Sequence, residues 1–343
     1  MRRAFITGTA GFIGYHLANL LLAEGWHVFG YDGMTDYYDV RLKQRRNDML
    51  HQYKHFISTE ALLEDAAALR AAVDHAAPDV VIHLAAQAGV RYSIDNPRAY
   101  VEANIVGTFN LMEAALAARP AHLLMASTSS VYGANTQMPY AETHKADTQM
   151  SFYAATKKAN EAMAHSWAHI HGLPITMFRF FTVYGPWGRP DMALFKFTRA
   201  ILEGTPIDVY NHGQMWRDFT YVDDLVRAIR LLMDTVPDGT GDAGMRDGAG
   251  FADDSLSPVA PFRVINIGNS TKVRLEDFID AIEDATGKTA VRNHMEMQQG
   301  DVPATWADAT LLRHLTGYAP QTQMRDGVAR FVNWYRETYS PGT

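Results

Sequence analysis

The chain has 343 residues, of which 47% are hydrophobic and 20% charged, with a formal net charge of −7. This composition is typical of a globular protein of one large domain or two lobes, and without a basic stripe we expect no nucleic-acid partner. The lack of cysteine excludes disulfides, thiolate catalysis and cysteine-based zinc sites.

Predicted strands and helices alternate along the first half of the chain. Apolar or β-branched runs predict strands over residues 3–7, 26–31, 78–84, 122–127 and 173–180. Apolar residues at helical spacing predict helices over residues 12–24, 99–118 and 153–171. Continuous β-branched runs suit parallel strands that are covered on both faces. The sequence therefore predicts an α/β fold, a Rossmann-type doubly wound parallel sheet.

After about residue 180 the pattern loosens, which favours a smaller, interleaved C-terminal substrate lobe. We expect residues 1–178 to form an NAD-binding domain completed by about 219–236 and 262–268. The substrate-binding lobe would then comprise 179–218 and 269–343. Residues 237–261 are rich in Gly, Asp, Ser and Pro, which predicts a flexible surface insertion. The strand pattern begins at Arg3 and no 18-residue apolar run occurs, so we expect no signal peptide, no membrane contact and a cytoplasmic location.

The first strand leads into a turn with glycines at positions 8, 11 and 14. Glycine lets a backbone turn tightly beside a diphosphate, and the following helix presents free N–H groups to it. Asp32 ends the second strand, where a carboxylate accepts hydrogen bonds from ribose hydroxyls and repels a 2′-phosphate. These features predict NAD as the cofactor; the family resemblance given below implies that it is tightly bound and recycled in each turnover. Its predicted contacts are Gly8, Gly11, Phe12, Ile13, Gly14, Asp32, Leu84, Ala85, Ala86 and Lys157.

Small residues after the strand over 78–84 favour a cofactor lying against that strand end. His83 lies within the apolar run itself. We interpret it as a hydrogen-bonded core histidine and not as a ligand.

Tyr153 and Lys157 are four residues apart on a predicted helix and so share one face. A phenol normally has a pKa near 10, too high for a base at neutral pH. A neighbouring ammonium and the positive charge of an oxidised nicotinamide would lower that pKa. Tyr153 would then accept the proton of a sugar hydroxyl while hydride leaves the same carbon.

With these motifs in place, the chain resembles the extended short-chain dehydrogenase/reductase superfamily. Within it, the chain is similar to the NAD-dependent nucleotide-sugar 4-epimerases, and most of all to the UDP-glucuronate 4-epimerases. The segments that carry the resemblance are TGTAGFIG (7–14), HLAAQAGVRYSIDNP (83–97), STSSVYG (127–133), YAATKKANE (153–161), FRFFTVYGPWGRPDMA (178–193), RDFTYVDD (217–224) and GDVPATWAD (300–308).

The resemblance implies inversion at C4 of a UDP-sugar through a transient 4-keto intermediate, UDP-glucuronate to UDP-galacturonate. Thr128 would hydrogen-bond the C4 oxygen beside Tyr153 and Lys157, completing the catalytic set. The implied substrate contacts are Ser129, Thr182, Arg189, Met192, Tyr210, Arg217 and Asp301. Arg217 would reach the diphosphate, Asp301 would lie near the nucleotide ribose, and Met192 and Tyr210 would contact the nucleotide. Arg189 would bind the sugar carboxylate; the alternative for Arg189 is an ion pair within its own loop.

Several alternatives to this function stay open. Related 4,6-dehydratases carry an Asp-Glu pair, and decarboxylases a Glu, where this chain has Ser129 and Ser130; this argues against loss of water and, less strongly, of CO2. The alternatives are a 4-epimerase of neutral UDP-sugars (UDP-glucose or UDP-N-acetylglucosamine), a UDP-glucuronate decarboxylase, and a non-catalytic NAD-binding sensor. The residues over 99–118 and 153–171 carry more apolar side chains than one core needs, and the resemblance implies a homodimer through this helix pair; the alternative is packing against the chain's own second lobe.

Overall fold

The structure, a computed structural model, describes residues 1–238, 253–298 and 300–339. Its centre is a seven-stranded parallel sheet in the order β10-β6-β5-β4-β1-β2-β3. The strands are β1 (Arg3–Thr7), β2 (His27–Asp32), β3 (Phe56–Glu60), β4 (Val80–His83), β5 (His122–Ala126), β6 (Ile175–Phe180) and β10 (Phe262–Ile267). The strand order turns back between β1 and β4, as in a doubly wound fold, so the predicted fold class is confirmed.

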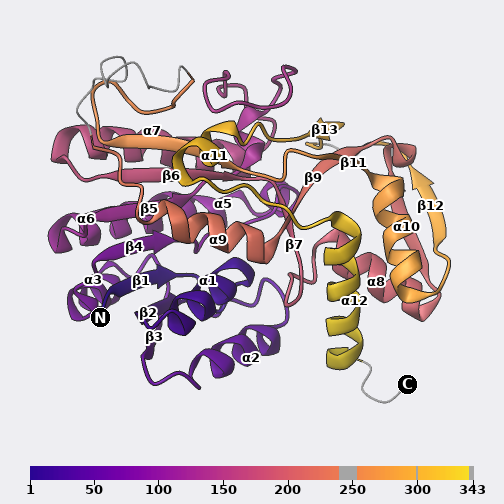
Figure 1. Ribbon diagram of the computed structural model, residues 1–343, viewed down its shortest axis with the longest axis horizontal. Helices are drawn as coiled ribbons and strands as arrows, with labels where there is room; N and C mark the ends of the chain where they lie inside the picture. The colour runs from indigo at the N-terminus through magenta and orange to yellow at the C-terminus, as the bar shows by residue number, and fades with distance from the viewer. Residues whose placement is uncertain (239–252, 299, 340–343) are drawn as a thin grey trace.

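Helices cover both faces of this sheet (Figure 1). On one face α1 (Phe12–Ala23) packs on α9 (Val222–Leu232), and α9 contacts α11 (Thr310–Thr316). On the other face α6 (Gly107–Ala118) lies between α3 (Ala66–Ala76) and α7 (Phe152–His171). A separate apolar core lies beneath each layer. No helix in the described ranges is long and apolar enough to cross a bilayer.

The smaller lobe lies beside the sheet, on the right in Figure 1, around a third apolar core. Its strands are β7 (Thr182–Tyr184), β8 (Pro206–Tyr210), β9 (Trp216–Tyr221), β11 (Lys272–Arg274), β12 (Val291–Met295) and β13 (Ala304–Thr305). Its helices are α8 (Ala193–Glu203), α10 (Leu275–Thr286), α12 (Met324–Tyr339) and the short η3 (Asn211–Gly213). The late strand β10 pairs with β6, so the chain returns to the large sheet after it has entered the smaller lobe.

Among the longer elements of residues 1–180, three were not predicted, and one predicted helix is interrupted. The sequence analysis did not find β3, α2 (Val40–Leu50) or α3. β3 is an edge strand, and its polar end and exposed Ile57 give no buried β-branched run. The helix predicted over 99–118 comprises α5 (Pro97–Tyr100), the π-helical η1 (Val101–Val106) and α6. The remaining short helices are α4 (Tyr92–Asp95) and η2 (Ser129–Tyr132).

The predicted flexible insertion is only partly within the described ranges. Residues 239–252 lie outside them. Residues 253–261 are packed on the protein: Asp254 pairs with Arg263 at 2.9 Å, and the Ser257 hydroxyl lies 2.9 Å from Nε2 of His165 on α7. Ala260 is buried. Residues 253–261 therefore contact the protein at these points, and Ala260 joins the core beneath α7. The flexibility of the insertion stays a prediction.

Candidate active site

A cavity of about 1100 Å³ collects residues from both lobes. All the residues that the sequence predicts for catalysis, cofactor or substrate line it: Gly8, Gly11, Phe12, Ile13, Gly14, Asp32, Leu84, Ala85, Ala86, Thr128, Ser129, Tyr153, Lys157, Thr182, Arg189, Met192, Tyr210, Arg217 and Asp301. The structure thus brings the set together, while the role of each member stays a prediction.

The glycine turn is built to present backbone to this cavity. Gly8 has φ +81°, and a Cβ at Gly14 would lie 2.0 Å from the Gly8 carbonyl oxygen. Helix α1 then begins with no side-chain cap and no acidic residue in its first turn. Its N-terminus therefore faces the cavity with positive polarity, which fits an anionic diphosphate.

Asp32 lies at the carboxyl end of β2 and lines the cavity. Its Oδ2 accepts a hydrogen bond from the Ala10 N–H at 3.0 Å, and its Oδ1 accepts one from the Met34 N–H at 2.9 Å. The carboxylate is thereby fixed beside the turn, with lone pairs left for ribose hydroxyls. Together the glycine turn and Asp32 fit NAD.

His83 is a buried core residue, as predicted. Its Nδ1 lies 2.8 Å from Oγ1 of Thr7, and its Nε2 lies 3.0 Å from Oγ1 of Thr108. Burial, aided by the charge of Lys157, lowers the pKa of His83 to about 3. The imidazole is therefore neutral and serves the packing between β1, β4 and α6.

Tyr153 and Lys157 lie in the first turns of α7, which Ser151 caps by accepting a hydrogen bond from the Ala154 N–H at 3.1 Å. Lys157 Nζ donates to the Ala126 carbonyl at 3.0 Å, at the end of β5. Thr128 follows two residues later, and its hydroxyl lowers the pKa of Tyr153. The end of β5 and the start of α7 therefore place a phenol, an ammonium and a hydroxyl at one wall of the cavity.

The pKa of Tyr153 in the protein alone differs from the expectation. Burial raises the pKa of Tyr153 above its ordinary value, and only the Thr128 hydrogen bond and the charge of Arg189 lower it in part. Lys157 does not contribute, since its ammonium is turned to the Ala126 carbonyl, and burial lowers its own pKa to about 8. The lowering predicted for Lys157 together with an oxidised nicotinamide stays a prediction. A net lowering requires a further positive charge, such as that of an oxidised nicotinamide.

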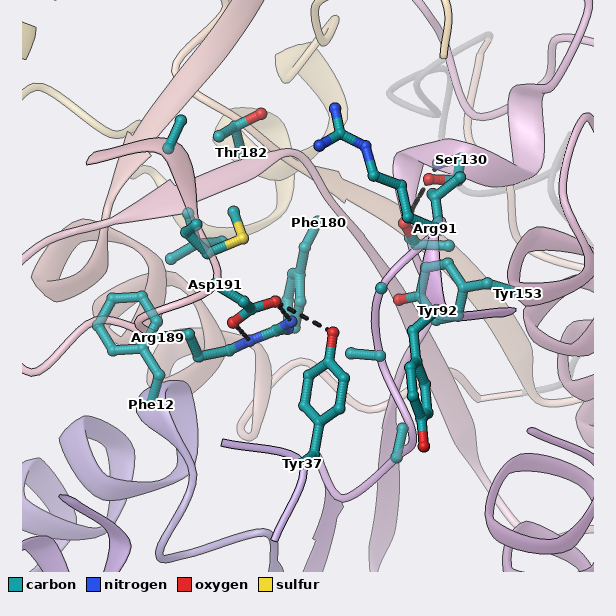
Figure 2. A pocket seen from close by; sticks show the side chains of 18 of the residues that line it. Phe12, Tyr37, Arg91, Tyr92, Ser130, Tyr153, Phe180, Thr182, Arg189 and Asp191 are labelled. Carbon is teal, nitrogen blue, oxygen red and sulfur yellow. Dashed lines mark hydrogen bonds and ion pairs between the residues drawn. The ribbon is translucent and has the colours of Figure 1, made fainter. Parts of the chain in front are cut away.

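Arg189 forms an ion pair within its own loop (Figure 2). Its Nε donates to Asp191 Oδ1 at 3.0 Å and its Nη2 to Asp191 Oδ2 at 2.5 Å, and the Tyr37 hydroxyl donates to the same Oδ2 at 3.2 Å. Burial and the charge of Asp191 raise the pKa of Tyr37 to about 12, so this hydroxyl stays protonated. Of the two interpretations of Arg189, the structure shows the loop ion pair; a contact to a sugar carboxylate stays a prediction.

Two cations lie toward the proposed nucleotide end. Arg217, on β9, lines the cavity, and no carboxylate in the described part of the chain forms an ion pair with it. Asp301, predicted near the nucleotide ribose, instead pairs with Arg91 at 3.3 Å. The Arg91 guanidinium lies 4.8 Å from the ring centroid of Tyr210. This end of the cavity can therefore attract a diphosphate through Arg217.

The sequence analysis assigned no role to several residues that line the cavity, among them Tyr37, Lys43, Arg91 and Tyr92. Figure 2 shows Tyr37 and Tyr92 beside Tyr153 and Asp191. Tyr37 follows β2 and Arg91 follows β4. Because ligands of such sheets bind at the carboxyl ends of strands, the position of these residues after predicted strands was the signal that could have found them.

Residues 4–243 match the family model described as the NAD dependent epimerase/dehydratase family. The chain is 55% identical over 337 residues to a probable UDP-glucuronate 4-epimerase of Rhizobium meliloti (strain 1021), covering 98% of both chains. It is 43% identical over 343 residues to UDP-glucuronate 4-epimerase 1 of Arabidopsis thaliana, covering 98% of this chain and 77% of the relative. It also resembles the UDP-glucuronic acid 4-epimerase of Bacillus cereus in complex with UDP-glucuronic acid and NAD, with a TM-score of 0.86, 30% identity and coverage of 99% and 100%.

Proposed function

The chain belongs to the NAD dependent epimerase/dehydratase family, and from this we propose that it is an NAD-dependent isomerase that converts UDP-glucuronate to UDP-galacturonate. The observation that carries the proposal is the single cavity that joins the Asp32 end, the Tyr153 wall and the Arg217 end. Residues 1–178, with 219–236 and 262–268, would hold the cofactor. Residues 179–218 and 269–343 would hold the sugar nucleotide.

In this proposal the catalytic side chains act at C4 of the sugar. Bound NAD supplies the chemistry, by taking hydride from C4 and returning it to the opposite face. Tyr153 takes the proton of the C4 hydroxyl and gives it back, which makes C4 a ketone in between. Thr128 holds the C4 oxygen beside Tyr153, because its hydroxyl acts on that phenol and lowers its pKa.

Retention of the carboxylate is the second task of such a site, because a 4-keto uronate is a β-keto acid and loses CO2 readily. Ser129 and Ser130 stand where dehydratase-like or decarboxylase-like relatives carry carboxyl groups. Ser129, Thr182 and Arg189 offer hydrogen bonds that would hold the carboxylate with its breaking bond poorly aligned. Met192 and Tyr210 would contact the nucleotide, and Asp301 its ribose.

One observation favours a second substrate class. The Arg189 fork is already bound at two points by Asp191, so a uronate meets a guanidinium whose charge is largely compensated. This favours a neutral UDP-sugar such as UDP-glucose, with the same chemistry at C4. The fold is compatible with both substrates, so an activity assay with each sugar has to distinguish them.

The test is incubation of the purified protein with UDP-glucuronate, with the products followed by NMR. UDP-galacturonate at constant total uronate is the expected result. A UDP-pentose with released CO2 would make the protein a decarboxylase. Turnover of UDP-glucose but not of UDP-glucuronate would identify the neutral-sugar epimerase, and no turnover of any sugar nucleotide would favour the NAD-binding sensor.

We also propose a homodimer through α6 and α7. These two helices pack together and expose apolar side chains, among them Phe109 and Phe152, which are 39% and 42% exposed. Large exposed apolar side chains on neighbouring helices are typical of a protein contact surface. Analytical ultracentrifugation of the wild type and of Phe109→Asp tests this: a dimer that becomes a monomer is expected, and a monomeric wild type would contradict it. The cytoplasmic location stays a prediction.

A further inference from the structure

Arg46 is a buried cation that the proposed chemistry does not use. It lies on α2, and its side chain is fully buried. No carboxylate within the described ranges forms an ion pair with it, and its Nε has no hydrogen-bond partner there. A buried charge is costly unless an opposite charge compensates it. The position of Arg46 therefore calls for an anion that the protein itself does not supply.

The contacts of Arg46 point to where that anion lies. Its Nη1 donates to the Ala10 carbonyl at 2.9 Å, within the glycine turn, and to the Tyr38 hydroxyl at 2.8 Å. The N–H of the same residue donates to Asp32 Oδ2. The guanidinium thus lies directly behind the turn whose front faces the cavity, and the N-terminus of α1 adds positive polarity there.

A second set of contacts joins this turn to the sugar end. Arg46 Nη2 donates to the Trp187 carbonyl at 2.5 Å and approaches the Gly188 carbonyl at 3.5 Å. Trp187 has φ +60°, a conformation that costs energy for a bulky residue and needs support from its surroundings. Arg189 is two residues after Trp187, so the side chain that fixes the cofactor turn also fixes the loop bearing the Arg189–Asp191 pair.

We propose that Arg46 is a positioning residue that supplies buried countercharge to the NAD diphosphate through the glycine turn and holds the Arg189 loop to that turn. The inference rests on the NAD binding of the proposed function. Lys43, also buried on α2 and lining the cavity, adds to the same positive region; burial lowers its pKa, and the charge of Arg46 lowers it further.

The test compares Arg46→Met with the matched variant Arg45→Met, which removes the same charge from the same helix at an exposed position over the Trp187 ring. NAD retained per purified chain is measured after acid release, and NAD affinity is measured by thermal shift against added NAD. For Arg46→Met we expect an affinity loss of roughly tenfold or more, since a charge this close acts through a poorly screened interior. For Arg45→Met we expect a change of less than about twofold, since its charge is screened by solvent.

The variant Arg46→Lys shows whether NAD binding depends on the charge of residue 46 or on the shape of its side chain. It also serves as a control in case Arg46→Met does not fold. It keeps the charge but loses the planar fork, so NAD affinity should stay within about threefold of wild type while KM for UDP-glucuronate rises. Wild-type NAD affinity in Arg46→Met, or an equal loss in Arg46→Lys and Arg46→Met, would overturn the countercharge proposal. A wild-type protein that binds no NAD would instead overturn the proposed function.

Discussion

Ser127 donates a hydrogen bond of 2.7 Å to the buried carboxylate of Glu161, and this contact joins the strand end that carries Thr128 to the helix that carries Tyr153. Glu161 is held in turn by Arg179, through Nε–Oε1 and Nη2–Oε2 contacts of 2.9 Å each. The buried Glu161–Arg179 ion pair therefore supports the Tyr153 wall of the cavity, and the Ser127 hydroxyl links the strand end to it alongside the Lys157–Ala126 contact.

Ser127→Ala should lower kcat by roughly tenfold and leave KM nearly unchanged, because the strand end that carries Thr128 loses one of its contacts with α7 while the binding groups stay in place. The free energy of unfolding should fall by about 1 kcal/mol, the usual worth of one hydrogen bond. Steady-state kinetics and urea unfolding measure the two effects. A loss of stability with unchanged kcat would show that Ser127 serves the fold alone.

Arg189→Ala should raise KM for UDP-glucuronate by roughly tenfold and KM for UDP-glucose by less than about threefold, since a charged contact is lost only with the acidic sugar. Measuring both sugars on one preparation makes UDP-glucose the internal control for general damage to the loop. An equal increase for both sugars would assign Arg189 to its ion pair with Asp191 and remove it from sugar recognition.

The pH dependence of turnover should report the ionisation of Tyr153. The phenolate is the active form, so kcat should rise with pH through the pKa of Tyr153 in the holoenzyme. The charge of Arg189 lowers this pKa, so Arg189→Gln should move the rise to higher pH. Tyr153→Phe should be inactive across the whole range and still retain NAD. A rise that stays at the same pH in Arg189→Gln would contradict the assignment.

Stability should fall in mild acid because of buried neutral histidines. Burial lowers the pKa of His122 to about 4, below its unfolded value near 6.5. Between these values the unfolded chain binds more protons, so the His122 contribution is complete above about pH 6.5 and is lost as pH falls. Between pH 7.5 and 5.5 the wild type should lose about 1 kcal/mol more than His122→Gln, measured by urea unfolding. Parallel curves for both proteins would contradict this.

The sequence analysis succeeded where the signal is local. The strand, glycine turn and helix that contain Gly8 and Gly14 are contiguous, and Tyr153 and Lys157 are one helical turn apart. It did not find contacts between distant segments. Tyr37 and Asp191 are separated by 154 positions, and Arg91 and Asp301 by 210. Such pairs depend on how the two lobes meet. For Arg189, the residue type alone allowed either an ion pair within its own loop or a contact to the sugar carboxylate.

The pairing of β10 with β6 has a consequence for biosynthesis. Until residues 262–267 have left the ribosome, β6 is the open edge of the large sheet and offers its backbone N–H and C=O groups to any passing strand. The nascent chain must therefore hold an unfinished sheet while about 80 further residues are made, at a rate of about 5–20 residues per second. A truncation before β10 should thus yield an aggregating fragment and not a free-standing dinucleotide-binding domain.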